Sequence, residues 1–162
     1  MTPDHKDSTS DKNLNSLTPQ DVLVVIPAYN EEKIVASVIT NLQTYGFKVL
    51  CVVDGCTDKT LQEVKTTGCL YLHHMVNLGQ GASLESGFEL VRNKLIHSPL
   101  IATFDSDGQH RASDLLAFLD AFNNDPSLQI ILGSRFINNS NTVPFSKRVI
   151  LKTFAKLSQF TL

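Results

Sequence analysis

The sequence predicts an α/β protein built on an open, mostly parallel sheet with helices on both faces, in three layers. Two observations support this prediction. Apolar runs of strand length alternate along the chain with segments whose apolar residues have helical spacing. The runs are also continuous, which is typical of strands covered on both faces. The expected strands are residues 22–26, 48–53, 69–73, 100–104 and 128–132.

The segments between these runs have the spacing of amphipathic helices. Ile34, Val38, Leu42 and Tyr45 share one face, and Gly46 follows as a stop signal. The same spacing recurs at Leu84, Phe88, Val91 and Leu95, and at Leu115, Leu119 and Phe122 with Phe118 beside them.

Composition narrows the class of protein. A length of 162 residues suits about one domain, and 42% apolar with 19% charged residues fits a globular protein. A net charge of -2 argues against a nucleic-acid partner. The three cysteines form no CxxC pair, and no apolar stretch approaches the roughly 18 residues of a membrane span. We therefore expect reduced thiols and a cytoplasmic protein, at most peripheral on the inner face of the membrane.

Three parts are expected along the chain. Residues 1–20 are polar and are predicted to be a disordered leader. Residues 21–136 form the folded domain, and residues 137–162 are a loop followed by an amphipathic helix. Arg148, Lys152 and Lys156 give that helix a basic stripe, which suits either a membrane surface or a helix packed on the sheet.

Two carboxylates, Asp105 and Asp107, follow the fourth apolar run. Ligands in open α/β sheets bind outside the carboxyl ends of the strands. With the amide oxygen of Gln109, these carboxylates could bind Mg²⁺ or Mn²⁺, and phosphate oxygens would complete the shell. Such a metal would stabilise a departing diphosphate. The alternative is a turn that caps the helix from Ala112.

The second and third strand ends also carry candidate groups. Asp54 could accept hydrogen bonds from a ribose hydroxyl or a nucleobase N–H. Alternatively it is a turn aspartate, with Thr57 or Asp58 capping the next helix. The segment NLGQGASLESG (77–87) places two glycines before a helix, so backbone N–H groups could face an anion.

The remaining candidates are one arginine and three histidines. Arg135 follows the fifth run and could hold a phosphate in its planar fork; otherwise it is a surface residue. His73, His74 and His110 have no partners at zinc-site spacing and are predicted to be structural. No nucleophile elbow or Ser/His/Asp arrangement is visible.

Five motifs together resemble the family 2 glycosyltransferases, which are inverting enzymes of the GT-A, nucleotide-diphospho-sugar transferase-like fold. The nearest resemblance is to the polyprenyl-phosphate branch, which includes dolichyl-phosphate mannosyltransferases. The motifs occur in family order within residues 21–150. They are VVIPAYNEE (24–32), VVDGCTDKT (52–60), NLGQGASLESG (77–87), DSDGQH (105–110) and GSRF (133–136).

The resemblance implies a role for each matching residue. Asp105, Asp107 and Gln109 would bind the metal, and Asp107 and Arg135 would act in catalysis. Arg135 would face the phosphates of donor or acceptor. Apart from the resemblance, Arg148 of the predicted C-terminal helix could help to bind the acceptor phosphate. The nucleotide sugar would lie against Pro27, Tyr29, Glu31, Val52, Asp54, Asp105, Ser106 and Gln109.

Two departures from the family pattern stand out. The family usually has two consecutive aspartates where this chain has Val53 and Asp54, and Cys56 stands where serine is common. Family catalytic domains also usually continue beyond the point corresponding to Leu162, so we expect a truncated chain with an incomplete acceptor region.

The function implied is transfer of a sugar from a nucleoside diphosphate sugar to a polyprenyl phosphate at a membrane surface. That acceptor is already anionic, so no general base is required. One alternative is a nucleotide-sugar-binding fragment without turnover, and another is a glycosyltransferase acting on a polysaccharide hydroxyl. A sugar nucleotidyltransferase is a third, but it would favour a glycine-rich loop after the first strand, and residues 27–33 contain no glycine.

Overall fold

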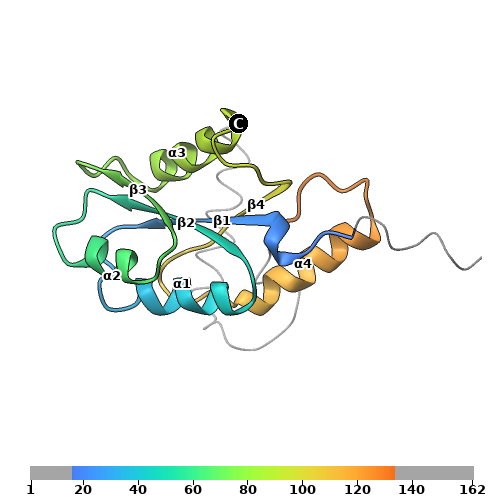
Figure 1. Ribbon diagram of the computed structural model, residues 1–162, viewed down its shortest axis with the longest axis horizontal. Helices are drawn as coiled ribbons and strands as arrows, with labels where there is room; N and C mark the ends of the chain where they lie inside the picture. Colours follow the sequence, from blue (N-terminus) through green and yellow to red (C-terminus); the bar gives the residue numbers. More distant parts are fainter. Residues whose placement is uncertain (1–15, 134–162) are drawn as a thin grey trace, which may run out of the picture. The chain divides into compact units, whose positions relative to one another are not determined.

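The computed structural model describes residues 16–133. The chain divides into two compact units, residues 1–128 and 129–162, which are considered separately. The first unit is built on a four-stranded sheet in the order β3-β2-β1-β4 (Figure 1), and every described strand pair is parallel. The strands are β1 (Val22–Ala28), β2 (Lys48–Asp54), β3 (Leu70–His74) and β4 (Leu100–Thr103).

A helix follows each strand, as a parallel sheet requires. They are α1 (Val35–Thr44), α2 (Thr60–Thr66), α3 (Gln80–Arg92) and α4 (Ala112–Asn124), and a short 3₁₀ turn, η1 (Pro19–Asp21), precedes β1. The expected α/β architecture, an open parallel sheet with helices on both faces as in the GT-A fold, is confirmed.

The two faces of the sheet bury two separate apolar clusters. Val24 and Ile26 of β1 belong to the cluster shared with α1, α2 and α4, whereas Leu23 and Val25 belong to the cluster beside α3. Figure 1 shows the same division, with α3 on one side of the sheet and the other three helices on the opposite side. Because successive side chains of a strand point to opposite faces, burial on both sides explains the continuous apolar run.

Helix α3 lies close against the sheet because Gly87 faces β1. A Cβ atom at this position would lie 2.6 Å from Cγ1 of Val25. The missing side chain therefore lets the helix backbone approach the strand.

The fifth expected strand is not formed. Residues 128–132 are described without strand structure, and Ile130 and Leu132 are exposed. The preference of a residue for strand structure depends on the neighbours it packs against. Among the described residues, 128–132 pair with no strand of the sheet.

Residues 17–20, which the sequence analysis placed in the leader, have defined contacts with the domain. The N–H of Leu17 donates to Oδ1 of Asn123 at 2.7 Å, and Nδ2 of Asn123 donates to the carbonyl oxygen of Leu17 at 2.9 Å. Leu17 also packs against the main core cluster, and η1 begins at Pro19. Residues 17–20 are thus part of the fold, because the Leu17 side chain packs on the core and the Leu17 backbone bonds to the Asn123 side chain. Residues 1–15 and 134–162, including the predicted C-terminal helix, lie outside the described residues.

The prediction that Tyr45 and Leu95 lie on the apolar faces of helices is wrong. Tyr45 is 40% exposed and Leu95 is 72% exposed. Both follow the last helical residue, since α1 ends at Thr44 and α3 at Arg92, so the helical period no longer determines where they point.

The cysteines are free thiols, as expected. Cys51 is buried in β2, and burial raises the pKa of its thiol strongly. Burial also raises the pKa of Cys69. Among residues 16–133, none of the helices has both the length and the apolar character needed to cross a bilayer.

Candidate functional site

The loops that follow the four strands carry the candidate residues of the sequence motifs. Because the strands are parallel, their carboxyl ends share one edge of the sheet. The loops at this edge are residues 29–34, 55–59, 75–79 and 104–111.

The loops after β1 and β2 are joined by hydrogen bonds to polar side chains. The N–H of Glu31 donates to Oγ1 of Thr60 at 2.8 Å, and the N–H of Glu32 donates to Oδ2 of Asp58 at 3.1 Å. Asp58 also accepts the N–H of Thr60, the first residue of α2, at 2.9 Å. Burial acts to raise the pKa of Asp58, but the hydrogen bonds from Thr60 and Glu32 outweigh it and lower the pKa. The N-cap of α2 is Lys59, so neither Thr57 nor Asp58 is the N-cap residue, although Asp58 bonds to the first N–H of the helix.

Cys56 joins the same two loops. Its Sγ accepts the N–H of Asn30 and donates to the carbonyl oxygen of Ala28, each at 3.3 Å. Oδ1 of Asn30 in turn accepts the N–H of Thr57 at 2.9 Å. Asn30 has a positive φ of 54°, which an asparagine tolerates better than most residues. The thiol thus makes the donor and acceptor contacts that a hydroxyl could make.

The Asp54 carboxylate is buried and holds the loop after β3. It accepts the N–H of Leu78 at 2.9 Å, the N–H of Gly79 at 2.7 Å and a hydrogen bond with Nδ1 of His74 at 2.8 Å. Burial acts to raise the pKa of Asp54, but the bonds from Leu78, His74 and Gly79 lower it overall. Both carboxylate oxygens already have protein partners, so a direct contact with a ribose stays a prediction.

A Ser/His/Asp arrangement is present, although the sequence analysis predicted none. Nε2 of His74 lies 3.0 Å from Oγ of Ser86, while Nδ1 contacts Asp54. Ser86 lies inside α3, where the helix uses the backbone N–H groups that an oxyanion hole would need. The arrangement is therefore structural. The parallel register brings Asp54 and His74 together at the ends of adjacent strands. This pairing could have been expected from the sequence, because both residues follow apolar runs of neighbouring strands.

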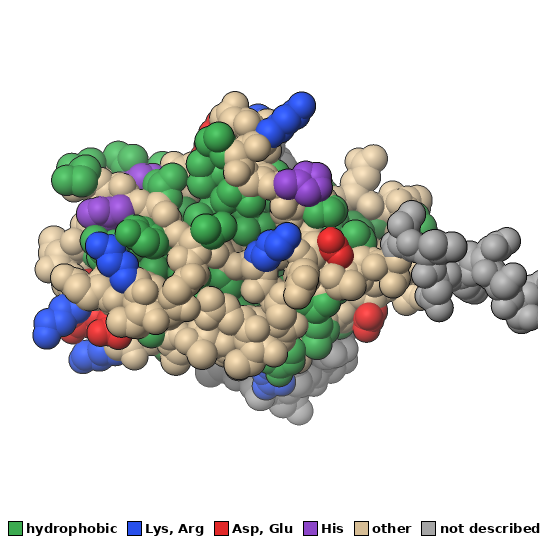
Figure 2. All heavy atoms as spheres, in the orientation of Figure 1, with side chains coloured by type: hydrophobic (Ala, Val, Ile, Leu, Met, Phe, Trp, Pro, Cys, Tyr) green, Lys and Arg blue, Asp and Glu red, His purple; other side chains and the backbone are tan. Residues whose placement is uncertain are grey.

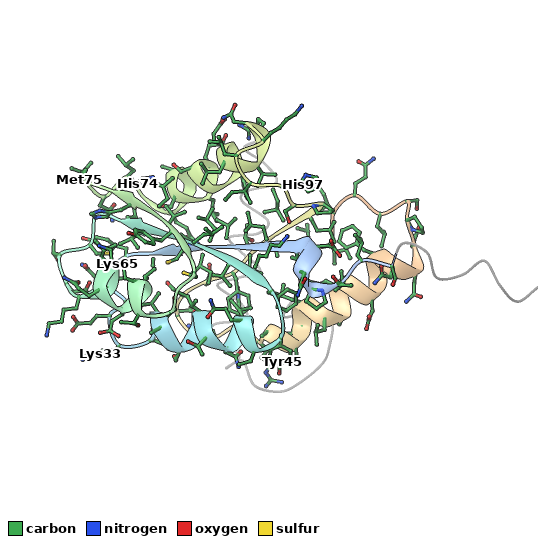
Figure 3. The ribbon with its side chains drawn as sticks, viewed as in Figure 1. Lys33, Tyr45, Lys65, His74, Met75 and His97 are labelled. Carbon is green, nitrogen blue, oxygen red and sulfur yellow. The ribbon has the colours of Figure 1, made fainter. Side chains whose placement is uncertain are left out.

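The loop after β3 keeps its shape although its side chains are exposed. Met75 is 85% exposed, and Val76 and Leu78 are also exposed. Figure 2 shows apolar side chains gathered over the end of β3, and Figure 3 shows Met75 next to His74 there. The backbone bonds to Asp54, rather than side-chain burial, thus fix this loop.

The Asp105 carboxylate is partly exposed and linked to α3. Nε2 of Gln80, the first residue of α3, donates to its Oδ1 at 3.0 Å. Nε2 of His110 lies 3.6 Å from its Oδ2, and the side chain of Asp105 is 42% exposed. The structure thus places a residue of the glycine-rich segment beside the predicted metal ligand, which the sequence analysis did not foresee.

Ser106 and Asp107 have different surroundings. Ser106 is buried, and its Oγ donates to the carbonyl oxygen of Pro27 at 3.1 Å, so its hydroxyl joins the loops after β4 and β1. Asp107 is exposed, and its Oδ1 accepts the N–H of Gln109 at 2.9 Å. A turn of the kind proposed as the alternative is therefore present, but it does not cap the helix from Ala112, because the N-cap of α4 is Arg111 and has no side-chain capping bond.

The donor set fits a hard divalent cation. Carboxylates from Asp105 and Asp107 and the amide of Gln109 supply oxygen atoms, which Mg²⁺ and Mn²⁺ prefer. Within residues 16–133 no three His, Cys, Asp or Glu side chains form a metal-binding group. Two carboxylates and one amide are too few to fill the coordination shell, so they suit a cation that also binds ligand phosphates and water.

The other expected nucleotide contacts differ in accessibility. Tyr29 is 49% exposed, and Glu31 and Pro27 are partly buried. Val52 is fully buried in β2, so its side chain serves the core. Arg135 and Arg148 lie outside the described residues.

Comparison with solved structures finds the same kind of fold. A mycobacterial protein matches with a TM-score of 0.52 at 17% identity, over 64% of this chain and 37% of that one. Glucosyl-3-phosphoglycerate synthase from Mycobacterium tuberculosis, solved with Mn²⁺, uridine diphosphate and glucosyl-3-phosphoglycerate, matches with a TM-score of 0.45 at 23% identity. That match covers 53% of this chain and 33% of the other.

Comparison with curated proteins identifies the family. An uncharacterized protein of Methanocaldococcus jannaschii is 33% identical over 84% of this chain and 56% of its own length. A UDP-N-acetylglucosamine–dolichyl-phosphate N-acetylglucosaminyltransferase of Methanococcus voltae is 28% identical over 79% of this chain and 58% of its own. A dolichyl-phosphate hexose transferase of Haloferax volcanii is 27% identical over 91% and 62%. The chain thus spans little more than half the length of these relatives. The model of glycosyl transferase family 2 matches residues 23–161, and the chain belongs to this family.

Proposed function

We propose that this chain provides the nucleotide-sugar half of an inverting glycosyltransferase that moves a sugar from a nucleoside diphosphate sugar to a polyprenyl phosphate. The observation that carries the proposal is the pair of accessible carboxylates, Asp105 and Asp107, at the carboxyl edge of a parallel sheet in a family 2 chain. Two curated relatives are named as dolichyl-phosphate sugar transferases, which supports a lipid phosphate as acceptor.

Asp105, Asp107 and Gln109 would hold Mg²⁺ or Mn²⁺. When bound, that cation neutralises the diphosphate and so makes it a better leaving group. Oxygen ligands on an accessible loop favour a cation that arrives with the nucleotide. Metal dependence is therefore part of the proposal.

The chain's own residues would bind and orient the donor. The aromatic ring of Tyr29 is exposed beside the loops that Cys56 and Asp58 fix, and it could stack on the nucleobase. The nucleoside of the donor would also lie against Glu31, Pro27 and the backbone of Val52. Asp54 acts there through the loop it holds, and we keep a direct contact with the ribose as a prediction.

In the reaction, an acceptor phosphate oxygen attacks the anomeric carbon. The new carbon–oxygen bond forms as the bond to the diphosphate breaks, and attack from the opposite side inverts the configuration. The acceptor is ionised near neutral pH, so no side chain has to remove a proton. Arg135 and Arg148 are the candidates for holding the acceptor or departing phosphates, and the reaction would take place at the inner surface of the membrane.

A second candidate function is binding of a nucleotide sugar without transfer of the sugar. A polysaccharide hydroxyl as acceptor would need a general base as well.

The proposal is tested by incubating the chain with nucleoside diphosphate sugars, a polyprenyl phosphate and Mn²⁺, and measuring both lipid-linked and free sugar. Lipid-linked sugar that disappears in Asp107→Ala is the expected result. Binding without either product would support the second function. Absence of binding to every donor tested would overturn both.

A further inference from the structure

One short segment of the chain connects the two acidic strand ends. The NLGQ segment, residues 77–80, has two backbone N–H groups on Asp54 at one end and the Gln80 side chain on Asp105 at the other. Anything that fixes this segment also fixes Gln80, and through Gln80 the Asp105 carboxylate.

The segment is pressed against the loop after β2. Gly55 has a φ of +60°, and a Cβ atom there would lie 2.1 Å from the backbone nitrogen of Asn77. The N–H of Gly55 also donates to the carbonyl oxygen of His74 at 3.1 Å, and Nδ2 of Asn77 donates to the carbonyl oxygen of Asp54 at 3.3 Å. The backbones on both sides of the Asp54 side chain are therefore in direct contact.

His74 determines how Asp54 can face this segment. An ionised carboxylate only accepts hydrogen bonds, so Nδ1 of His74 must carry the proton in the 2.8 Å contact. In a neutral imidazole Nε2 is then the acceptor, and the hydroxyl of Ser86 donates to it over 3.0 Å. Both ring nitrogens are used, and the side chain of His74 is only 10% exposed, so the ring is held in one orientation.

We propose that His74 is a positioning residue for Asp105. Ser86 holds the His74 ring, and the ring orients the Asp54 carboxylate. That carboxylate binds the N–H groups of Leu78 and Gly79. The NLGQ segment, fixed in this way, places Gln80 on Asp105. The inference rests on the proposed function in treating Asp105 as a metal ligand. The arrangement sets the Asp105 carboxylate before a nucleotide arrives, which lowers the cost of ordering the site on binding.

Two variants separate the two contacts of the ring, and a third serves as the control. His74→Asn keeps a donor near the position of Nδ1 and loses the contact with Ser86. His74→Gln reaches toward Ser86 and loses the donor to Asp54. The neighbouring His73 is exposed and alternates to the other face of β3, so His73→Asn is the matched control.

The direct measurement is NMR of the whole chain without metal or nucleotide. Hydrogen exchange at the N–H groups of Leu78 and Gly79 is expected to accelerate about tenfold in His74→Gln, the change for loss of one typical hydrogen bond. The same variant should shift the side-chain amide signal of Gln80 toward its position in Asp105→Ala. His74→Asn should retain most of the protection, and His73→Asn should match the wild type.

Imidazole ¹⁵N shifts of His74 provide a second readout that does not depend on His74→Gln folding. They should report a proton on Nδ1, the nitrogen that faces Asp54, and Ser86→Ala should perturb the Nε2 signal. Absence of a proton on Nδ1, or unchanged Leu78, Gly79 and Gln80 signals in a folded His74→Gln, would overturn the proposal.

Metal titration distinguishes this inference from the proposed function. Mn²⁺ binding in the presence of a nucleoside diphosphate should weaken about tenfold in His74→Gln and in Gln80→Ala, and less in His74→Asn. If the wild type binds no Mn²⁺ while the NMR results hold, the metal role of Asp105 fails and its positioning by His74 stands.

Discussion

Cys56 shows how a single departure from a family pattern is accommodated. Its thiol bridges the carbonyl oxygen of Ala28, the last residue of β1, and the N–H of Asn30 in the loop that follows. A serine hydroxyl can make the same pair of contacts, so the substitution keeps the loops together. The residue type differs while the hydrogen-bonding role is kept.

Protonation of Asp58 should be visible in stability. Replacement by Ala removes the acceptor for the N–H groups of Thr60 and Glu32, and should cost about 1–2 kcal/mol at pH 7. The pKa of Asp58 is lower in the folded chain, so its contribution is present above the unfolded value, about 3.9. The contribution is lost as the pH falls through the lowered folded value.

Urea unfolding of wild type and Asp58→Ala at a series of pH values measures this effect. The difference in unfolding free energy should be constant from pH 7 to about 5 and should shrink below about pH 4. Asp120, an exposed residue of α4, provides the control substitution Asp120→Ala. A difference that grows on acidification would show that the carboxylate is not stabilised by folding.

At the scale of elements, the closeness of α3 to the sheet should depend on Gly87. An added methyl group at Gly87 would meet Val25, so Gly87→Ala should destabilise the protein by about 1–3 kcal/mol. Gly81 lies in the same helix, but a Cβ atom there has nothing within 4 Å. Gly81→Ala should therefore stabilise by roughly 0.5–1 kcal/mol, because alanine favours the helix. Chemical denaturation gives both values, and equal effects of the two substitutions would contradict the close packing of α3.

The start of the ordered chain can be located by truncation. Deleting residues 1–15, whose composition offers little to bury, should leave the melting temperature nearly unchanged. Deleting residues 1–20 removes Leu17 with its two bonds to Asn123 and should lower it by several degrees. Asn123→Ala should reproduce part of that fall. Equal melting temperatures for the two truncations would mean that the Leu17 contacts contribute nothing.

At the scale of the whole molecule, the sequence predicts those features that depend on local pattern. The apolar runs of β1, β2, β3 and β4 are confirmed as strands. Burial on both faces explains the continuous signal of β1 and β2, whereas β3 and β4 are only partly buried. Residues 128–132 have the same pattern but form no strand. An apolar run alone therefore specifies neither burial nor pairing, since Ile130 and Leu132 are exposed.

The site is predicted less completely than the fold. Asp105 and Asp107 could be found because they follow an apolar run directly. The bonds of Asp54 to Leu78 and Gly79 join backbone groups more than 20 residues away, and no residue type encodes them. The contact between Gln80 and Asp105 arises in the same way, from two loops that meet only in the folded chain.

The central claim is that Asp105 and Asp107 bind a divalent cation together with a nucleoside diphosphate. Calorimetric titration of uridine or guanosine diphosphate into the chain, with and without Mn²⁺, tests it most directly. The metal should tighten binding by about tenfold or more in the wild type and in Asp120→Ala, and by nothing measurable in Asp107→Ala. An equal response to Mn²⁺ in Asp107→Ala, or no response in the wild type, would contradict the claim.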